Sequence, residues 1–304
     1  MEELIPAMGH ALVALSDGEA VQPLRTVLPV AEHGGYFFVM PAYCGALGAK
    51  LVTLYPENEG DVPTHHALVL LFRADTGEPL ATMDGRLITE MRTAAVSAAA
   101  TERLARRDAR VLAIIGSGVQ AGSHLEALRL VRDFAEVRVW SPHRAAEFAR
   151  RRDRVRAARS AEEAVRDADV IVTATTATAP VLRGEWLSPG AHVVAVGACR
   201  PEWRELDDEA LRRVRRIFVE SREAAAQESG DVIASGRELV EMGEVFSGAR
   251  PGRESPEEVT LFKSVGVAVE DVVAADLVYR KALAAGGDLI NHRPIGATRR
   301  GGTP

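Results

Sequence analysis

The chain has 304 residues, of which 47% are hydrophobic and 26% charged, and its formal net charge is −6. The sequence has no apolar run of the ~18 residues needed to cross a bilayer, so we expect no membrane-spanning segment. The acidic balance disfavours nucleic acid as a partner, because such binding needs a basic face. The start, MEELIPAMGH, lacks the basic residues of a secretion signal, and Cys44 and Cys199 provide no disulfide framework. We therefore expect a cytoplasmic protein.

The first hundred residues predict strands followed by one helix. Apolar runs and moderate alternation indicate strands over 36–40, 49–55, 67–72 and 79–83. Thr76-Gly77 is typical of a turn, so residues 67–83 are a candidate hairpin. The alanine-rich stretch 88–104 has no glycine or proline and is expected to be helical.

After residue 108 strands and helices alternate. We expect strands at 110–115, 137–140, 170–174, 191–196 and 217–220, and helices from the glycine loop to 131 and over 145–151 and 161–166. Such alternation predicts parallel βαβ units. A last helix is expected over 271–285, followed by a polar tail, 291–304, that we expect to be mobile.

A glycine-rich turn opens the first of these units. It is the pattern Gly116-x-Gly118-x-x-Ala121, enclosing Val119 and Gln120, between an apolar strand and a helix. In that context it is typical of a dinucleotide-binding loop, where the first glycine permits the turn, the second lets the backbone approach a pyrophosphate, and the alanine keeps helix and strand close. The helix N-terminus favours phosphate.

The end of the next strand bears on the choice of cofactor. An acidic residue there accepts hydrogen bonds from the ribose of NAD(H) and repels a 2′-phosphate. This chain has Ser141, His143 and Arg144 instead. The sequence therefore favours NADP(H), with NAD(H) as the other possibility. Alternatively, Arg144 has no cofactor role and is simply a solvated residue at the start of a helix.

Several segments together resemble the ornithine cyclodeaminase/mu-crystallin family, and its mu-crystallin/ketimine reductase branch in particular. They run from about residue 21 to 279: VQPLRTVLPV, GYFFVMPAY, AKLVTLYPEN, MRTAAVSAAAT, GSGVQA, ADVIVTAT, AVGACRPEWRELDDE, ESGDVIASG and TLFKSVGVAVED. The resemblance implies a homodimer of α/β fold. It implies a Rossmann doubly wound parallel sheet, residues 108–264, inserted into an α+β substrate-binding and dimerisation domain formed by residues 1–107 and 265–304.

The resemblance also implies roles for particular residues. Arg25, Lys50 and Arg92 match substrate-binding positions, and Arg92 lies between the substrate carboxylate and the nicotinamide. Pocket shape is expected to depend on Met40, Tyr43 and His66. Val265, which with Ser264 matches the family's nicotinamide-side loop, is a further substrate-binding candidate. The implied cofactor contacts, beyond the glycine turn, are Thr64, Arg92, Thr175 and Ser264.

One departure from the family pattern concerns the reaction. In the cyclodeaminases an aspartate follows the VGx segment and serves as acid and base, and the ungapped position here is Cys199. A thiol, with a pKa near ~8.5, is a poorer base at neutral pH. The departure disfavours ornithine cyclodeamination and favours imine reduction, with Cys199 expected only to fill space at the edge of the site.

The residues suggest a chemical hypothesis for a small imino acid. Two arginines can hold its carboxylate, and Lys50 can supply the proton that nitrogen needs when hydride reaches the carbon. Neighbouring arginines are expected to lower the pKa of Lys50 towards neutrality. The catalytic candidates are thus Lys50 and Arg92. The alternative is that Arg25 and Arg92 have no role in function and are ordinary surface or interface residues.

Three other functions remain open from the sequence alone. They are a cyclodeaminase acting on ornithine or lysine, an amino-acid dehydrogenase of the alanine type, and a non-catalytic NADPH-binding protein. We expect no metal site, since no spacing suits metal ligands. We expect His124 and His192 to be packed inside, Asp207-Asp208 to start a helix, and the basic run 150–159 to be a solvated helix face.

Overall fold

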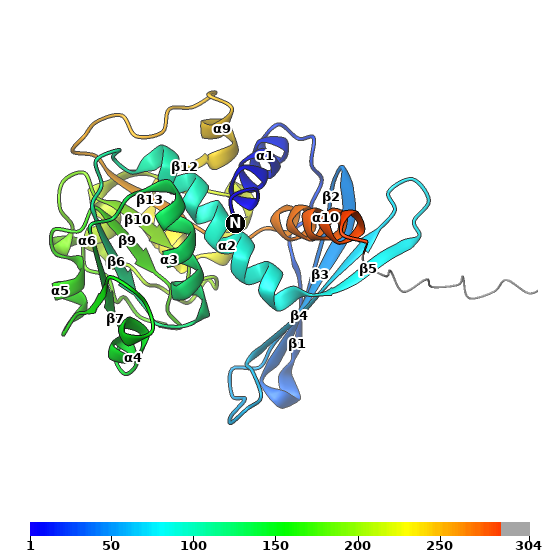
Figure 1. Cartoon of the computed structure of the whole chain (residues 1–304), viewed down its shortest axis with the longest axis horizontal. Coiled ribbons are helices and arrows are strands. Elements are labelled where there is room, and N and C mark those ends of the chain that lie inside the picture. The colour runs from blue at the N-terminus through cyan, green and yellow to red at the C-terminus, as the bar shows by residue number, and fades with distance from the viewer. Residues whose placement is uncertain (287–304) are drawn as a thin grey trace, which may run out of the picture.

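The computed structural model describes residues 1–286, so the predicted tail, 291–304, lies outside the described residues. Two β-sheets are arranged side by side, with a long helix running obliquely between them (Figure 1). One sheet is parallel and has eight strands, and the other is antiparallel and has five. The α/β class and the parallel sheet expected from the sequence are confirmed.

The parallel sheet has the strand order of a doubly wound dinucleotide-binding fold. The order is β12-β11-β13-β10-β9-β6-β7-β8, and all neighbours pair in parallel. Read from β8, the chain order is reversed between β6 and β9, which is where such folds bind their ligands. The strands are β6 (Val111–Ile115), β7 (Glu136–Trp140), β8 (Val155–Ala157), β9 (Val170–Thr173), β10 (His192–Ala195), β11 (Val214–Val219), β12 (Glu238–Glu241) and β13 (Val259–Lys263).

Both faces of this sheet are buried at its centre, because the central strands β6, β9, β10 and β13 consist mainly of apolar residues and are buried at almost every position. In β6, Leu112 and Ile114 point into one core, while Ala113 and Ile115 point into the other. The helices of this part are α3 (Val119–Val131), α4 (Ala145–Arg150), α5 (Ala161–Val165), α6 (Asp208–Arg213), α7 (Arg222–Glu228), α8 (Gly230–Ser235) and α9 (Met242–Phe246), with the 3-10 turn η2 (Gly184–Trp186).

The antiparallel sheet is a meander in sequence order. It comprises β1 (Thr26–Val30), η1 (Ala31–His33), β2 (Gly35–Cys44), β3 (Ala46–Leu54), β4 (His65–Phe72) and β5 (Pro79–Asp84). Helix α10 (Ala268–Ala284) lies on one face, against β2, β3 and β4. The approach is close at Gly48, where a Cβ would lie 3.1 Å from Val272 Cγ2. The predicted 67–83 hairpin is confirmed as β4 and β5.

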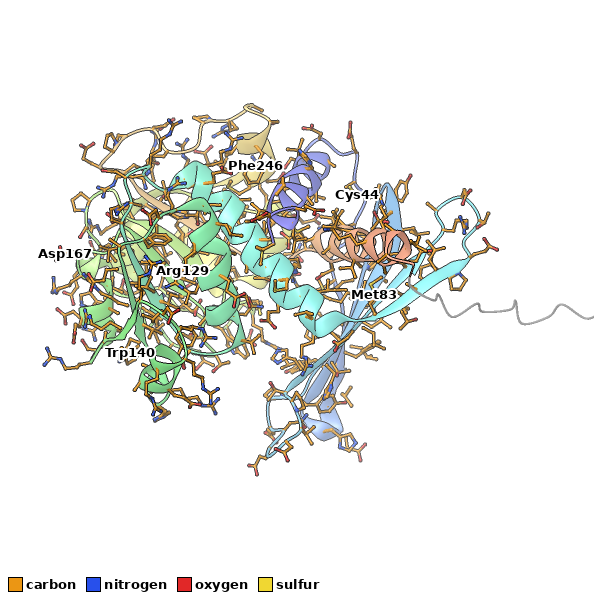
Figure 2. All side chains as sticks on the ribbon, viewed as in Figure 1. Cys44, Met83, Arg129, Trp140, Asp167 and Phe246 are labelled. Carbon is orange, nitrogen blue, oxygen red and sulfur yellow. The ribbon has the colours of Figure 1, made fainter. Side chains whose placement is uncertain are left out.

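Helix α2 (Gly85–Leu104) connects the two sheets. Asp84 caps it by accepting a 2.8 Å hydrogen bond from the Arg86 amide. Its alanines, such as Ala95 and Ala98, are fully buried, which lets α2 pack closely on α3. Helices α1 (Leu4–Ser16) and α9 pack against each other beside it, with Phe246 close to Gly9 (Figure 2). The hydrophobic core on this side is continuous across both sheets, so the division at residues 107/108 and 264/265 stays a prediction.

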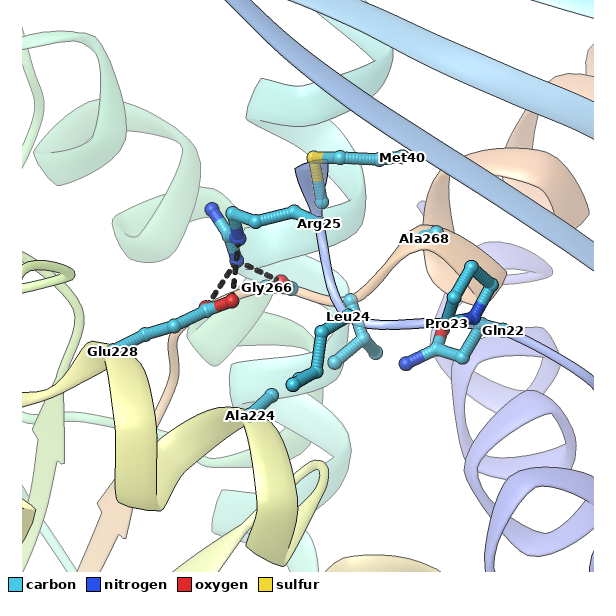
Figure 3. A pocket seen from close by; sticks show the side chains of 10 residues that line it. Gln22, Pro23, Leu24, Arg25, Met40, Ala224, Glu228, Gly266 and Ala268 are labelled. Atoms are coloured by element: carbon cyan, nitrogen blue, oxygen red, sulfur yellow. Dashed lines mark hydrogen bonds and ion pairs between the residues drawn. The ribbon is translucent and has the colours of Figure 1, made fainter. Parts of the chain in front are cut away.

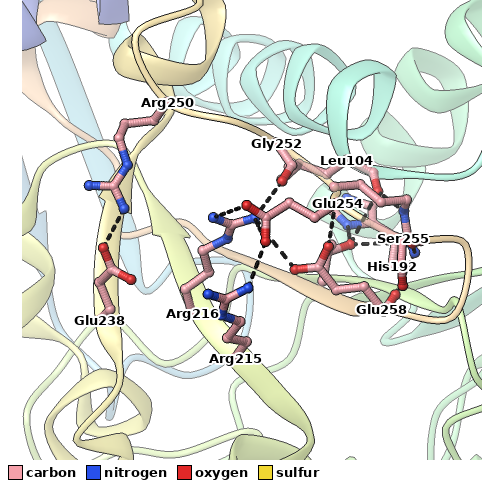
Figure 4. A network of polar contacts seen from close by, with 12 residues as sticks. Leu104, His192, Arg215, Arg216, Glu238, Arg250, Gly252, Glu254, Ser255 and Glu258 are labelled. Carbon is pink, nitrogen blue, oxygen red and sulfur yellow. Dashed lines mark hydrogen bonds and ion pairs between the residues drawn. The ribbon is translucent and has the colours of Figure 1, made fainter.

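A polar brace holds the loop that joins α9 to β13. Arg216 donates to the Gly252 carbonyl at 2.7 Å, and Arg215 pairs with Glu254 at 2.7 Å (Figure 4). Glu254 in turn accepts from Arg216 at 3.4 Å. This network lies under the loop and orients β13, a central strand that the sequence analysis did not predict.

Candidate functional site

The glycine turn lies where β6 ends, at the carboxyl edge of the parallel sheet. Gly116 has φ +121°, and a Cβ there would lie 2.3 Å from the Ala174 carbonyl oxygen. Only glycine fits this crossing of two chain segments. Ala121 is fully buried between α3 and the sheet. The structure thus gives Gly116 and Ala121 the packing roles expected from the pattern.

Gly118 is different, because a Cβ at this position would meet nothing within 4 Å. No contact within the described protein therefore requires glycine here, whereas a pyrophosphate lying on the backbone would. Val119 begins the 13-residue helix α3 and is 61% exposed, so the free amides of the first turn face open space. The turn fits a dinucleotide on geometric grounds.

The end of β7 lies beside this turn and carries the residues that bear on a 2′-phosphate. The Ser117 and Ser141 hydroxyls are 2.8 Å apart, and Ser141 Oγ accepts from the Arg144 amide at 3.2 Å. His143 and Arg144 are exposed just after Trp140 (Figure 2). A hydroxyl and two cationic side chains are therefore available at this strand end.

A buried carboxylate fixes the ends of β9 and β10. Glu205 Oε1 accepts from the Thr175 amide at 2.9 Å and the Thr175 hydroxyl at 2.7 Å. Its Oε2 accepts from the Thr173 hydroxyl at 2.8 Å and the Gly197 amide at 2.7 Å. Glu205 is fully buried, so four donors compensate for the loss of water around its charge. Thr175 is thereby held rigidly at the sheet edge.

A cluster of buried charges lies between the two sheets. Lys50, on β3, forms a 2.6 Å ion pair with Asp271 on α10. Arg92, on α2, donates to Asp271 at 2.9 Å and to Glu270 at 2.7 Å. Each of these four side chains is 5% exposed or less. Three elements that are far apart in the sequence thus bring together two cations and two carboxylates.

Burial changes the proton affinity of Lys50. It lowers the pKa of the amine to about 8; Asp271 opposes this shift, and the Arg92 and Arg25 charges add to it. The sequence analysis attributed the lowering to the arginines, but the loss of solvation is the larger cause. At neutral pH the amine is mostly protonated. Because its pKa is close to this pH, it can also release the proton readily.

The pKa values of the two carboxyl groups in the cluster are shifted in opposite directions. Burial raises the pKa of Glu270 to about 8, although Arg92 opposes the shift. For Asp271 burial acts in the same direction, but Arg92 and Lys50 outweigh it and the pKa is lowered. Asp271 is therefore the charged partner of both cations, and Glu270 titrates in the same range as Lys50.

Arg25 closes a narrow pocket next to this cluster (Figure 3). Its guanidinium pairs with Glu228 at 2.8 and 2.7 Å and donates to the carbonyls of Val265 at 2.9 Å and Gly266 at 2.7 Å. Met40, Glu228 and Gly266 are among the lining residues. The pocket encloses about 20 Å³, room for roughly one water molecule. A larger ligand must displace Glu228 from Arg25.

The structure brings together most of the substrate-site candidates. Met40 is the cross-strand neighbour of Lys50, and both face α10. The Gly266 backbone lies under the Arg92 guanidinium, since a Cβ there would be 2.6 Å from Nη1 and Nη2. Arg25 and Arg92 therefore meet the same short loop, whose first residue, Ser264, follows β13 at the carboxyl edge.

Four other candidates lie apart from the cluster. Strand alternation puts His66 and Tyr43 on the sheet face opposite to that of Lys50. Tyr43 is exposed there and does not line the pocket beside Lys50, contrary to the expectation from the sequence. Thr64 precedes β4, where its hydroxyl lies 2.9 Å from His65 Nδ1. Cys199 is exposed in the loop after β10. The roles of His66 and Thr64 stay predictions.

Sequence reasoning missed the acidic residues of the site: Glu205, Glu220, Glu228, Glu270 and Asp271. Two signals were present. Glu220 ends the apolar stretch RIFVE, a position at the carboxyl edge of a strand. Glu270 and Asp271 occur in the first turn of α10, where acidic residues ordinarily stabilise the helix dipole. That ordinary interpretation hides the pairing with Lys50 and Arg92.

Most of the residues that we expected to have structural roles do so, but the basic run 150–159 is not a helix face, because α4 ends at Arg150 and the run continues through a turn into β8. His124 and His192 are fully buried, and each is hydrogen-bonded to a hydroxyl, of Ser97 and Thr260 respectively. Asp207 caps α6 by accepting from the Ala210 amide at 2.7 Å. None of the helices within residues 1–286 has the length and apolarity that crossing a membrane requires.

The strand order, the glycine turn at the switch point and the adjoining buried charges define an α/β protein of the dinucleotide-binding class. The model of the ornithine cyclodeaminase/mu-crystallin family matches residues 1–286, and the chain belongs to this family. It is 52% identical over 287 residues to ketimine reductase mu-crystallin of Mus musculus, with 91% of each chain covered.

Two solved structures are similar over almost the whole chain. One is the Thermococcus litoralis Δ1-pyrroline-2-carboxylate reductase in complex with NADH and L-proline, with 39% identity, a TM-score of 0.90 and 94% of each chain covered. The other is an archaeal alanine dehydrogenase dimer with bound NAD, with 35% identity, a TM-score of 0.90 and coverage of 96% of this chain and 95% of that chain.

Proposed function

We propose that this protein reduces a cyclic ketimine, an imino acid with its carboxylate next to a C=N bond, using NAD(P)H. The observation that carries the proposal is the lysine and two arginines gathered against the loop 264–266, which leaves the same sheet edge as the glycine turn. Relatives named ketimine reductase and Δ1-pyrroline-2-carboxylate reductase support this chemistry. The exposed Cys199, at the cyclodeaminase aspartate position, favours reductase over lyase.

The two arginines hold the substrate carboxylate. Arg25 Nε exchanges Glu228 for the substrate carboxylate. Arg25 Nη2 keeps its hydrogen bonds to the Val265 and Gly266 carbonyls. Arg92 keeps Asp271 on its Nε and Glu270 on Nη1, which leaves Nη2 to face the ligand. One contact from each arginine, made from two directions, fixes the orientation of a planar carboxylate.

Lys50 supplies the proton. When bound, the nicotinamide supplies hydride to the imine carbon. An iminium accepts hydride far better than a neutral imine, so a proton must be held at the nitrogen, and the Lys50 Nζ, with a pKa of about 8, can donate it. Asp271 orients Nζ through their 2.6 Å contact. Burial of this cluster excludes bulk water from the reacting atoms.

The residues that would hold the cofactor are those of the carboxyl edge: Gly116, Gly118, Val119, Gln120, Ala121, Ser141, His143, Arg144, Thr175 and Ser264. We propose NADP(H) as the preferred form, because Ser141, His143 and Arg144 can bind a 2′-phosphate and no carboxylate stands at this strand end to repel it. The structure with NADH and that with NAD belong to relatives, so NAD(H) remains the alternative.

We also propose a cytoplasmic homodimer joined through the outer face of the five-stranded sheet, the face turned away from α10. Leu28, Tyr43 and Leu68 on this face are 57%, 44% and 48% exposed. Large exposed apolar side chains gathered on one face are typical of an interface. A dimeric relative with the same fold is consistent with this arrangement.

The test is a panel of NADPH and NADH oxidation with five- and six-membered cyclic 2-imino acids. We expect turnover with at least one ring size, and a higher kcat/KM with NADPH than with NADH. Ammonia release from ornithine with bound NAD+ would identify a lyase instead. A requirement for added ammonia with a keto acid would identify an amino-acid dehydrogenase.

A further inference from the structure

Glu220 is a buried carboxylate whose hydrogen bonds within residues 1–286 all come from one loop. It follows β11 at the carboxyl edge and is fully buried. Its Oε1 accepts from the Ser264 hydroxyl at 2.5 Å and the Gly266 amide at 3.2 Å, and its Oε2 accepts from the Val265 amide at 3.1 Å. Three consecutive residues are thus tied to one side chain.

Two residues of this loop also contact the arginines. The carbonyls of Val265 and Gly266 accept from Arg25 Nη2. Gly266, at φ +72°, has its backbone against the Arg92 guanidinium, where a Cβ would lie 2.6 Å from two nitrogens. The amides of Val265 and Gly266 point to Glu220 and the carbonyls of the same two residues to Arg25, so the carboxylate restrains the peptide planes that contact the arginines.

Glu220 is also close enough to act on the arginine by charge. Together with Asp271 and Glu270, which contribute more, it raises the pKa of Arg92 against the effect of burial. The loop 264–266 leads directly into α10, which carries both of those residues. Glu220 therefore connects the parallel sheet to the loop that contacts Arg25 and Arg92 and leads into α10.

We infer that Glu220 is a positioning residue that sets the places of Arg25 and Arg92 through the loop 264–266. The inference rests on the proposed function for the ligand that the arginines hold. It does not make Glu220 a group that touches the substrate. It predicts that Glu220 affects the binding of the carboxylate more than the binding of the nicotinamide cofactor.

Glu220→Gln tests the inference without changing the size of the side chain. All the groups that face Glu220 are donors: one hydroxyl and two amides. Whichever way the Gln amide turns, its NH₂ faces the amide of Val265 or Gly266, and that amide loses its acceptor. Glu223→Gln is the matched control, because Glu223 is exposed on α7 only three residues away.

Binding is measured by calorimetry with pyrrole-2-carboxylate, a planar cyclic carboxylate, in the presence of NADP+. We expect Glu220→Gln to weaken this binding by about 10-fold or more while the Kd of NADPH changes by less than about 3-fold. In turnover, KM for the imino acid rises by a similar factor. Glu223→Gln shows neither change. Equal losses for both ligands, or none, would overturn the inference.

A crystal structure of Glu220→Gln keeps the inference testable if the native protein reduces no imine. We expect the loop 264–266 and both guanidinium groups to be displaced relative to the native crystal structure. Superposition of the loop and both arginines in the two structures would overturn the inference. Displacement in a protein without imine turnover would leave the inference standing and reject only the proposed function.

Discussion

At the residue scale, Lys50 is unusual because its amine is buried. Lys50 is 3% exposed and has one charged partner, Asp271, at 2.6 Å. A buried ammonium beside a cationic guanidinium costs stability, so its presence calls for a use. Lysine can donate a proton near neutral pH and arginine cannot, and the chain, which uses arginine almost everywhere else, keeps a lysine here.

Lys50→Met should abolish most of the turnover and leave the cofactor bound. Methionine fills similar space but has no proton to give, so kcat is expected to fall ~100-fold or more. Steady-state kinetics and NADPH titration measure the two effects. Lys281→Met, at an exposed lysine paired with Glu3, is the control. An equal loss of NADPH affinity would mean that Lys50 is structural.

The pH profile should show the loss of a proton near pH 8. The protonated amine is the active form, so kcat/KM is expected to fall as pH rises through about 8, the pKa of Lys50. Glu270 titrates in the same range, and Glu270→Gln separates the two because the amide is always neutral. If Lys50 is the donor, the decrease persists in Glu270→Gln. If the decrease disappears, Glu270 carries the proton.

At the element scale, the sequence predicted the glycine turn and its flanking strand and helix because those signals are local. It also predicted most strands of the parallel sheet. It did not predict the strands β1, β8, β12 and β13 or the helices α1, α7, α8 and α9, and it began the last helix at 271 rather than 268. The insertion of β13 between β10 and β11 depends on pairings between residues far apart, such as Phe218 with Phe262, which no local pattern specifies.

The candidate site, too, was only partly predictable from the sequence. Arg25, Lys50 and Arg92 could be proposed from a resemblance, but their partners could not. Lys50 meets Asp271 only because β3 and α10 pack together across 221 positions of sequence. Carboxylates at a helix start or a strand end have ordinary local explanations, so their burial beside cations becomes visible only in three dimensions.

Gly118→Ala and Gly116→Ala should separate binding from folding at the turn. A Cβ at Gly118 meets no protein atom within 4 Å, so Gly118→Ala is expected to raise the Kd of NADPH ~10-fold or more with little change in thermal stability. Gly116→Ala puts a Cβ 2.3 Å from a carbonyl at φ +121°, and should lower the free energy of unfolding by at least ~1 kcal/mol. Unchanged NADPH binding in Gly118→Ala would contradict the proposed cofactor site.

At the scale of the whole molecule, α2 and α10 join the two sheets and carry the charged groups that meet between them. One face of the five-stranded sheet is covered by α10, and the other presents exposed leucines and a tyrosine. A monomer would leave this apolar face in water, which is unfavourable. Lys50, Arg92 and their carboxylate partners come from one chain, so we expect the proposed dimer to stabilise the sheet that carries Lys50.

Leu68→Glu should convert the dimer to monomers. A charge on the outer face would be buried without a partner in the dimer, which costs several kcal/mol. Sedimentation velocity is expected to show a shift to the monomer mass. Leu130→Glu, at a leucine equally exposed on α3, is the control and should not change the mass. A Leu68→Glu protein that remains dimeric would place the interface elsewhere.

The most direct test of imine reduction by hydride transfer uses a deuterium label on the cofactor. The protein is incubated with NADPH deuterated at C4 of the nicotinamide and with a cyclic 2-imino acid, and the product is analysed by mass spectrometry and NMR. We expect an imino acid reduced to a cyclic amino acid, with deuterium on the carbon that carries the carboxylate. NADPH left unoxidised, or product without deuterium at that carbon, would contradict the account.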